Sequence, residues 1–365
     1  MKIVTVMGAR PQFIKAAAVS RAIGTDYADR IEEVLVHTGQ HHDENMSKVF
    51  FEELDIPEPK YNLKISGGTH GAMTGRMLEA VENVLLQEKP DYLLIYGDTN
   101  STLAGALAAA KLHIPVAHIE AGLRSFNMRM PEEVNRILSD RVSTFLFCPT
   151  ETAVKNLQAE GLVKGVANVG DVMYDVALFY REKARHQSSI LQRLNLTPKE
   201  YALATCHRAE NTDDPLRLES ILSALAEITK QLPVVFPLHP RTHKLIGEYG
   251  LSHWLQRLTV TEPLSFIDMV ALEQAAKVIL TDSGGVQKEA FFYDVPCITL
   301  RDETEWIETV ELGANRLVGA SSVRILESME NLANRPTNCS NANPYGAGEA
   351  AKNILKLMIN HDNTK

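Results

Sequence analysis

The chain has 365 residues, of which 45% are hydrophobic and 23% are charged, and its formal net charge is −9. This length exceeds one ordinary hydrophobic core and suits two domains. The acidic balance excludes a surface that is basic throughout, which broad binding to nucleic acid or acidic lipid requires. No apolar run reaches the roughly 18 residues of a membrane span, and the first residues lack the pattern of a signal peptide. We therefore expect a cytoplasmic protein with no nucleic-acid or membrane partner.

Short apolar runs alternate with longer segments of helical period along the first half. The runs predict buried strands at residues 3–7, 33–36, 92–96, 116–119 and 145–148. The segments between them predict helices at residues 14–23, 73–86 and 102–112. Continuous apolar strands separated by helices are typical of a parallel sheet that is covered on both faces.

The second half repeats this alternation. Strands are expected at residues 202–205, 234–238, 258–260, 278–281 and 297–300, and helices at 216–231, 267–275, 286–292 and 348–359. We predict an α/β protein with two Rossmann-like doubly wound domains facing a cleft, residues 1–170 and 171–347. In such sheets ligands bind outside the carboxyl ends of the strands, so polar residues that follow strands are the candidates for chemistry.

A glycine turn follows the first predicted strand and leads from Gly8 into a helix. Such a turn presents backbone N–H groups to an anion, and Arg10 and Lys15 add positive charge there. The turn matches neither the GxGxxG pattern nor a P-loop. A plain strand-to-helix turn with surface charges remains the alternative.

Three carboxylates follow neighbouring elements of the first half, namely Asp98, Glu120 and Glu132. Asp98 ends a strand, where it also suits a helix N-cap. Glu120 ends a buried strand and needs a partner or a function there, and Glu132 has Arg136 four residues further along as a candidate ion-pair partner. Clustered acids shift one another's pKa, as general acid–base catalysis requires.

Two other polar groups invite a metal or redox interpretation. His41 and His42 are neighbours in a loop, which does not converge two side chains on one ion, and no further ligand spacing matches zinc. We predict no metal and a polar, ligand-contacting loop. The cysteines, at 148, 206, 297 and 339, are far apart and expected to be free thiols, with Cys206 notable because it adjoins His207.

In the second half, His207 and Arg208 follow the first strand and His239 follows the second. After the strand at 278–281 comes the run Asp-Ser-Gly-Gly-Val-Gln-Lys-Glu, residues 282–289. Ser283, Gly284 and Gly285 at a helix start form a cradle of N–H groups and a hydroxyl that suits a phosphate. Glu289, one turn further along, is placed to accept hydrogen bonds from ribose hydroxyls.

Together these segments resemble the non-hydrolysing UDP-N-acetylglucosamine 2-epimerases along essentially the whole chain. The resemblance rests on Gly-Asp-Thr at 97–99, His-Ile-Glu-Ala-Gly-Leu-Arg at 118–124, Pro-Glu-Glu-Val-Asn-Arg at 131–136, His-Arg at 207–208 and Asp-Ser-Gly-Gly-Val-Gln at 282–287. It implies a fold like the GT-B glycosyltransferases, a homodimer, a C-terminal helix (348–365) packed on the first domain, and neither metal nor NAD.

The resemblance also implies roles for residues. The catalytic groups correspond to Asp98, Glu120, Glu132 and His207. The UDP site expected from the motifs and the resemblance comprises Arg10, Lys15, Arg208, His239, Phe266 (beside the uracil), Ser283, Gly284, Gly285 and Glu289. The family's route removes the C2 proton, expels UDP from C1 to give a 2-acetamidoglucal, and adds UDP back with protonation from the opposite face.

Some segments depart from the commonest family pattern. Gly-Ala-Arg-Pro-Gln (8–12) replaces Gly-Thr-Arg-Pro-Glu, and Glu-Trp-Ile-Glu (305–308) replaces Glu-Arg-Pro-Glu, which removes one cationic UDP contact. These variants resemble the branch that acts on UDP-2,3-diacetamido-2,3-dideoxyglucuronate, which supplies a mannuronate derivative for surface polysaccharide. A uronate needs an added cation, for which Arg124 and Arg129 are the candidates.

Other functions compete with this one. A GT-B-type glycosyltransferase shares the fold and the UDP site, and a hydrolysing 2-epimerase shares most of the chemistry. A non-catalytic UDP-sugar sensor is the non-enzyme alternative. The set of three acids with His207 favours epimerisation over transfer and over a sensor, and net release of free sugar would separate a hydrolysing enzyme.

Overall fold

The computed structural model describes residues 1–40, 56–332 and 342–363, and the chain divides into two compact units. Unit 1 comprises Met1–Val176 and Pro344–Lys365, and unit 2 comprises Ala177–Asn343. The chain passes from unit 1 to unit 2 inside helix α7 (Val172–Gln187), a few residues after the expected boundary at 170.

Within its described residues, unit 1 contains one parallel sheet in the order β3-β2-β1-β4-β5-β6-β7. The strands are β1 (Lys2–Met7), β2 (Glu32–His37), β3 (Tyr61–Asn62), β4 (Tyr92–Tyr96), β5 (Val116–Ile119), β6 (Phe145–Cys148) and β7 (Val166–Asn168). The order reverses direction between β1 and β4, which is the point where doubly wound sheets bind ligands.

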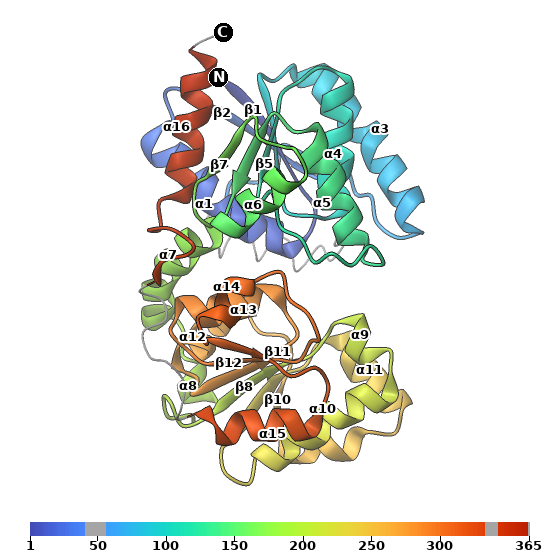
Figure 1. Cartoon of the computed structure of the whole chain (residues 1–365), viewed down its shortest axis with the longest axis vertical. Coiled ribbons are helices and arrows are strands. Elements are labelled where there is room, and N and C mark those ends of the chain that lie inside the picture. Colours follow the sequence, from blue (N-terminus) through green and yellow to red (C-terminus); the bar gives the residue numbers. More distant parts are fainter. Residues whose placement is uncertain (41–55, 333–341, 364–365) are drawn as a thin grey trace. The chain divides into compact units, whose positions relative to one another are not determined.

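Helices cover both faces of this sheet. They are α1 (Arg10–Asp26), α3 (His70–Glu88), α4 (Asn100–Lys111), α5 (Pro131–Val142), α6 (Glu151–Ala159) and α16 (Ala350–Asp362). Helices α3, α4 and α5 lie on one side, and α1 lies with α16 on the other (Figure 1). Valines of β1 and β2 pack with the apolar side chains of α3 and α4 in one buried cluster, which explains why these strands are continuously apolar.

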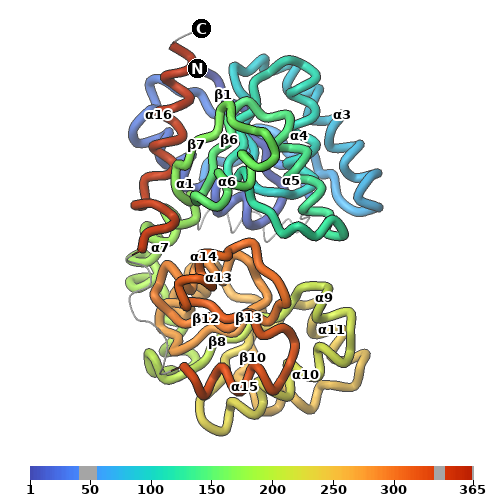
Figure 2. Tube along the Cα trace, viewed as in Figure 1, coloured from blue at the N-terminus to red at the C-terminus, as the bar shows by residue number. Residues whose placement is uncertain are grey.

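The C-terminal helix α16 belongs to unit 1 and packs against α1, as both traces show (Figures 1 and 2). The hydroxyl of Tyr92 lies 2.8 Å from Nδ1 of His361, and Lys352 Nζ lies 2.9 Å from Asp26. At the start of the helix, the amides of Ala350 and Ala351 donate to the carboxylate of Asp175 on α7.

Unit 2 repeats the scheme with a six-stranded parallel sheet in the order β10-β9-β8-β11-β12-β13. Its strands are β8 (Ala202–Thr205), β9 (Val234–Pro237), β10 (Thr259–Thr261), β11 (Val278–Thr281), β12 (Cys297–Thr299) and β13 (Asn315–Leu317). Its helices are α8 (Ile190–Arg193), α9 (Ala209–Thr212), α10 (Pro215–Ile228), α11 (Pro240–Glu248), α12 (Phe266–Ala275), α13 (Gly284–Phe292), α14 (Ile307–Glu311) and α15 (Ser322–Glu330), with a 3-10 turn at Ser252–Arg257.

Helices α10 and α15 cover one face of this second sheet, and α12 and α13 cover the other (Figure 1). The order again reverses direction at its centre, between β8 and β11. The predicted α/β class with two doubly wound parallel sheets is therefore confirmed. The short edge strands β3, β7 and β13 were not expected, because each has only two or three residues that are largely half-exposed and gives no apolar run.

The junction between α7 and α16 carries a titratable group whose effect on stability can be measured. Burial raises the pKa of Asp175 to about 6, although the amides of Ala351 and Ala350 oppose the shift. An unfolded aspartate titrates at about 4, so between about pH 4 and 6 the folded protein holds the additional proton. Stability contributed by this group is present below pH 4 and is lost as the pH rises through 6.

We therefore expect Asp175→Asn to gain stability relative to the wild type as the pH rises from 4 to 6, with a constant difference above 6. Thermal unfolding midpoints at a series of pH values measure this difference. Asp26→Asn, which removes the carboxylate partner of Lys352 on α16, is the control for the loss of an exposed carboxylate at this helix. A pH-independent difference for Asp175→Asn would contradict the assignment.

Candidate active site

The turn after β1 is closed by a side chain of the helix that follows it. Gln12 Oε1 accepts from the amides of Gly8 and Ala9, at 2.8 and 3.1 Å, and its Nε2 donates to Tyr96 O at 2.9 Å. A side chain at Gly8 would collide with the hydroxyl of Thr38, so glycine is required there. The expectation that these amides are open to an anion is therefore wrong, because Gln12 already accepts from both.

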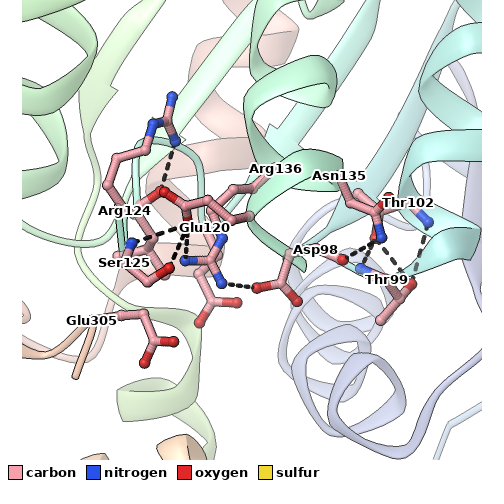
Figure 3. A network of polar contacts seen from close by, with 12 residues as sticks. Asp98, Thr99, Thr102, Glu120, Arg124, Ser125, Asn135, Arg136 and Glu305 are labelled. Atoms are coloured by element: carbon pink, nitrogen blue, oxygen red, sulfur yellow. Dashed lines mark hydrogen bonds and ion pairs between the residues drawn. The ribbon is translucent and has the colours of Figure 1, made fainter. Parts of the chain in front are cut away.

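Asp98 stands at the carboxyl end of β4, at the point where the sheet order reverses. Its carboxylate pairs with Arg136, and its backbone carbonyl accepts from Asn135 Nδ2 at 2.9 Å (Figure 3). The helix that follows is capped by Thr99, so Asp98 itself is not the N-cap. Its side chain is 29% exposed, which leaves the carboxylate accessible for chemistry while α5 fixes its position.

Glu120 follows β5 in a backbone conformation that non-glycine residues rarely adopt, with φ of +70°. Its amide donates to Phe147 O at 3.1 Å, and its buried carboxylate pairs with Lys15 of α1. Gly97 lies directly beneath, because a Cβ added there would stand 3.1 Å from Glu120 Oε2. Strained backbone that the surrounding structure holds in place is typical of functional sites.

The two adjacent glutamates at the start of α5 differ in their environments. Glu133 is buried, and it accepts from the amides of Ser125 and Phe126 at 3.0 and 2.9 Å and from Arg136 at 3.0 Å. Glu132 is half-buried, and among the described residues no side chain is hydrogen-bonded or ion-paired to it. The structure therefore gives Glu133 the task of holding the loop and leaves Glu132 available.

Arg136 is the residue that sequence analysis undervalued. The sequence suggests it only as a partner of Glu132, whereas it lies between Asp98 and the Ser125 loop and pairs with Asp98 and Glu133 (Figure 3). The pairing with Glu133 could have been predicted from the sequence, because residues i and i+3 lie on the same face of a helix. The pairing with Asp98 joins the end of β4 to α5 and had no local signal.

The two arginines proposed for the sugar lie in different environments. Arg124 is 3% exposed, and it donates two hydrogen bonds to Glu160, at 2.6 and 2.8 Å, and one to Asp140 at 2.8 Å. Since both carboxylates hold its guanidinium inside unit 1, the predicted sugar contact by Arg124 does not fit this geometry. Arg129 is exposed, in the loop before α5.

In unit 2, the buried carboxylate of Asp282 organises the loop after β8. It accepts from the amide of His207 at 2.9 Å and of Arg208 at 3.0 Å, and from Asn211 Nδ2 at 3.2 Å. The imidazole of His207 is 39% exposed, with Nδ1 3.7 Å from Asp282. The neighbouring Cys206 is buried, and burial followed by Asp282 raises the pKa of its thiol, so it is a core residue rather than a nucleophile.

The Ser-Gly-Gly run forms the start of α13, with Ser283 as its N-cap. Two donors stand near Gly284, since a Cβ added there would lie 3.4 Å from Trp306 Nε1 and 4.0 Å from an Arg208 nitrogen. Lys288 Nζ lies 3.8 Å from the ring centre of Trp306. A helix N-terminus with these donors suits a negatively charged group.

Two other residues expected at the UDP site have local structural roles. His239 caps α11, where its Nδ1 accepts from the amide of Arg241 at 3.2 Å, so the proton is on Nε2. Phe266 begins α12 and is 4% exposed, with its ring edge-on to Tyr180 at 5.1 Å. Little of that ring is left to contact a base.

Within residues 1–40, 56–332 and 342–363, no group of three or more His, Cys, Asp or Glu side chains is placed to hold a metal ion. The pair at His41 and His42 lies outside these ranges, as does Cys339. None of the described helices is both long and apolar enough to cross a bilayer.

Comparison with known proteins identifies the class. Residues 25–359 match the family model described as UDP-N-acetylglucosamine 2-epimerase, and the chain belongs to this family. The predicted family and enzyme class, an isomerase of the UDP-sugar 2-epimerase type, are confirmed.

Individual relatives cover nearly the whole chain. The UDP-2,3-diacetamido-2,3-dideoxy-D-glucuronate 2-epimerase of Pseudomonas aeruginosa is 54% identical over 98% of this chain and 99% of its own. The crystal structure of Methanocaldococcus jannaschii UDP-GlcNAc 2-epimerase with UDP-GlcNAc and UDP superposes with a TM-score of 0.91 at 44% identity, covering 98% and 99% of the two chains. The Neisseria meningitidis enzyme bound to UDP-GlcNAc gives 0.89 at 32% identity, covering 99% and 100%.

The two glutamates of α5 provide a test of the site's construction. Replacing Glu133 by Gln places an amide N–H₂ against donors and removes the buried partner of Arg136, which costs about 3 kcal/mol of unfolding free energy. We expect the thermal midpoint to fall by roughly 6–12 °C. Glu132→Gln, one residue away, is the matched control and should change stability by less than about 0.5 kcal/mol. Equal losses in the two variants would show that the division of roles is wrong.

Proposed function

We propose that this protein interconverts the C2 epimers of UDP-2,3-diacetamido-2,3-dideoxyglucuronate, with UDP-N-acetylglucosamine as the alternative substrate. The choice of substrate rests on the 54% identity, over nearly the full length of both chains, to the Pseudomonas UDP-2,3-diacetamido-2,3-dideoxy-D-glucuronate 2-epimerase. The departures at Gln12 and Trp306 from the commonest family pattern support the same branch.

The chemistry explains why carboxylates and an anion site occur in one protein. The C2 hydrogen of such a sugar is not next to a carbonyl group, so an enolate route is poor. Removing the C2 proton while the C1–O bond to UDP breaks gives a 2-acetamidoglucal, and UDP adds back as C2 is protonated from the other face. This route needs proton-transfer groups for both faces and donors that stabilise departing UDP.

The residues divide between these tasks. In the proposal, Asp98, Glu120 and Glu132 of unit 1 and His207 of unit 2 transfer protons. Arg10, Arg208 and the start of α13 stabilise the diphosphate, and Glu289 accepts from ribose hydroxyls. Support comes from the accessibility of Asp98, Glu132 and His207 and from the two donors beside Gly284. Lys15 acts through Glu120, to which it is paired, rather than on UDP directly.

The substrate and the reaction are tested by proton NMR in deuterated water, with the two nucleotide sugars in parallel. We expect deuterium to appear at C2 of the diacetamido glucuronate as its manno epimer forms, and more slowly, if at all, with UDP-N-acetylglucosamine. The reverse preference would change the substrate. Exchange with neither, in protein shown to bind UDP, would contradict epimerisation and favour a transferase or a sensor. Net release of free sugar would indicate a hydrolysing enzyme.

Arg129 is the cation that we propose for the uronate carboxylate, because Arg124 is held by Asp140 and Glu160. Arg129→Met should lower kcat/KM for the diacetamido glucuronate about tenfold, the loss of one charge-assisted hydrogen bond. It should leave turnover of UDP-N-acetylglucosamine unchanged. Arg141→Met, in the last turn of α5, is the control. Equal losses with both sugars would reject a role in selecting the uronate.

The homodimer and the cytoplasmic location expected from the sequence stay predictions. Light scattering coupled to gel filtration measures the first directly.

A further inference from the structure

His118 lies in β5, two residues before Glu120, and is completely buried. Its Nε2 is 2.7 Å from the backbone carbonyl of Gly97, and its Nδ1 is 2.7 Å from Oδ1 of Asp140. Both partners are oxygen atoms at short hydrogen-bond distance. Nothing in the proposed chemistry uses this side chain, although it touches the residue that precedes Asp98.

The two contacts determine where the protons are. A carbonyl oxygen only accepts, so Nε2 must donate to Gly97. If Nδ1 carried no proton, its lone pair would face an oxygen of Asp140 at 2.7 Å, which is repulsive unless Asp140 is protonated. Independently of His118, Arg124 Nη1 donates to Oδ2 of Asp140 at 2.8 Å and the amide of Gly122 donates to it at 3.2 Å, and both contacts favour the ionised carboxylate. A proton on both nitrogens is therefore the arrangement in which every contact is attractive.

The surroundings compensate the resulting positive charge. Asp140, also fully buried, accepts through Oδ2 from Arg124 Nη1 at 2.8 Å and from the amide of Gly122 at 3.2 Å. Arg124 in turn pairs with Glu160 at 2.6 Å. The four side chains carry two positive and two negative charges, and a buried set of charges is tolerated when it is paired and hydrogen-bonded in this way.

The Gly97 peptide connects the buried charged side chains around His118 to the carboxylates of Asp98 and Glu120. Gly97 adopts a φ of +61° and its amide donates to Ile119 O at 3.0 Å, so the ends of β4 and β5 are joined at this residue. The carboxylate of Glu120 and the ammonium of Lys15 lie above it, 3.1 and 3.4 Å from the position of an added Cβ. A rotation of this peptide would move Asp98, the next residue, and would press the glycine against Glu120.

We infer that His118 is a positioning residue, a buried imidazolium that holds the Gly97 carbonyl and thereby sets Asp98 and Glu120 for proton transfer. Its role in positioning rests on the proposed function of those two acids. Its protonation state rests only on the contacts with Gly97 and Asp140, and the two parts are tested separately.

The protonation state is measured on the unmodified protein by ¹H–¹⁵N correlation of its ¹⁵N-histidine-labelled form at neutral pH. The signal that is missing from His118→Gln identifies the residue. We expect both ring nitrogens of His118 to show a bonded proton and imidazolium chemical shifts. A neutral ring with one protonated nitrogen would overturn the inference, whatever reaction the protein catalyses.

The positioning role is measured by steady-state kinetics of His118→Gln, with exposed His243→Gln as the control. We expect kcat to fall about a hundredfold, as small misplacements of catalytic groups do, while KM and the affinity for UDP stay within about threefold. His243→Gln should match the wild type. The positioning role would be overturned if kcat stayed within threefold of the wild type. It would also be overturned if the loss of kcat equalled the loss of protein able to bind UDP. A wild type that shows no C2 exchange would instead contradict the proposed function, and the NMR result would still decide the protonation state.

Discussion

The acidic site of unit 1 depends on the fixed orientation of one peptide, that of Gly97. This residue follows β4 at the point where the sheet order reverses, it has a positive φ, and the Asp98 side chain that comes next is partly exposed. Lacking a side chain, it also leaves the space that Glu120 and Lys15 occupy. The constraint explains why a glycine must precede the aspartate, and why the nearby strand ends carry so many buried polar groups.

Each unit contains a buried aspartate whose carboxylate holds neighbouring groups in place. Asp140 in unit 1 and Asp282 in unit 2 are 0% exposed; Asp140 belongs to α5, and Asp282 directly follows β11. Asp140 binds side chains, His118 and Arg124, whereas Asp282 mainly accepts from the backbone of the His207 loop. A buried carboxylate that accepts from several donors is fixed in position, so it holds a loop more firmly than a water-exposed ion pair can.

Much of the fold followed from the sequence, because the central strands are continuously apolar and the helices between them are regular. The edge strands β3, β7 and β13 had no such signal. At the candidate site, the motifs predict Asp98, Glu120 and Glu132, whose positions after strands or at a helix start are local properties. The partners that fix them, such as Arg136 with Asp98 and His118 with Gly97, are separated by many residues and depend on how strands pair. The partners of Arg124 have no local signal either, since one carboxylate comes from α5 and the other from the residue that follows α6.

The two units also differ in the groups at their strand ends, carboxylates in unit 1 and hydrogen-bond donors in unit 2, and this difference suits the two halves of the proposed reaction. In unit 1 the cations Lys15 and Arg136 are paired with Glu120 and Asp98, so a positively charged side chain holds each carboxylate in place. In unit 2 the first turn of α13 presents backbone donors, with the indole of Trp306 and the guanidinium of Arg208 nearby. Carboxylates held in place by cations are suited to transfer protons, and a helix start surrounded by donors is suited to bind a diphosphate. Neither arrangement could perform the other's task, which is a physical reason for the chain to carry two sheets of the same design with different residues at their ends.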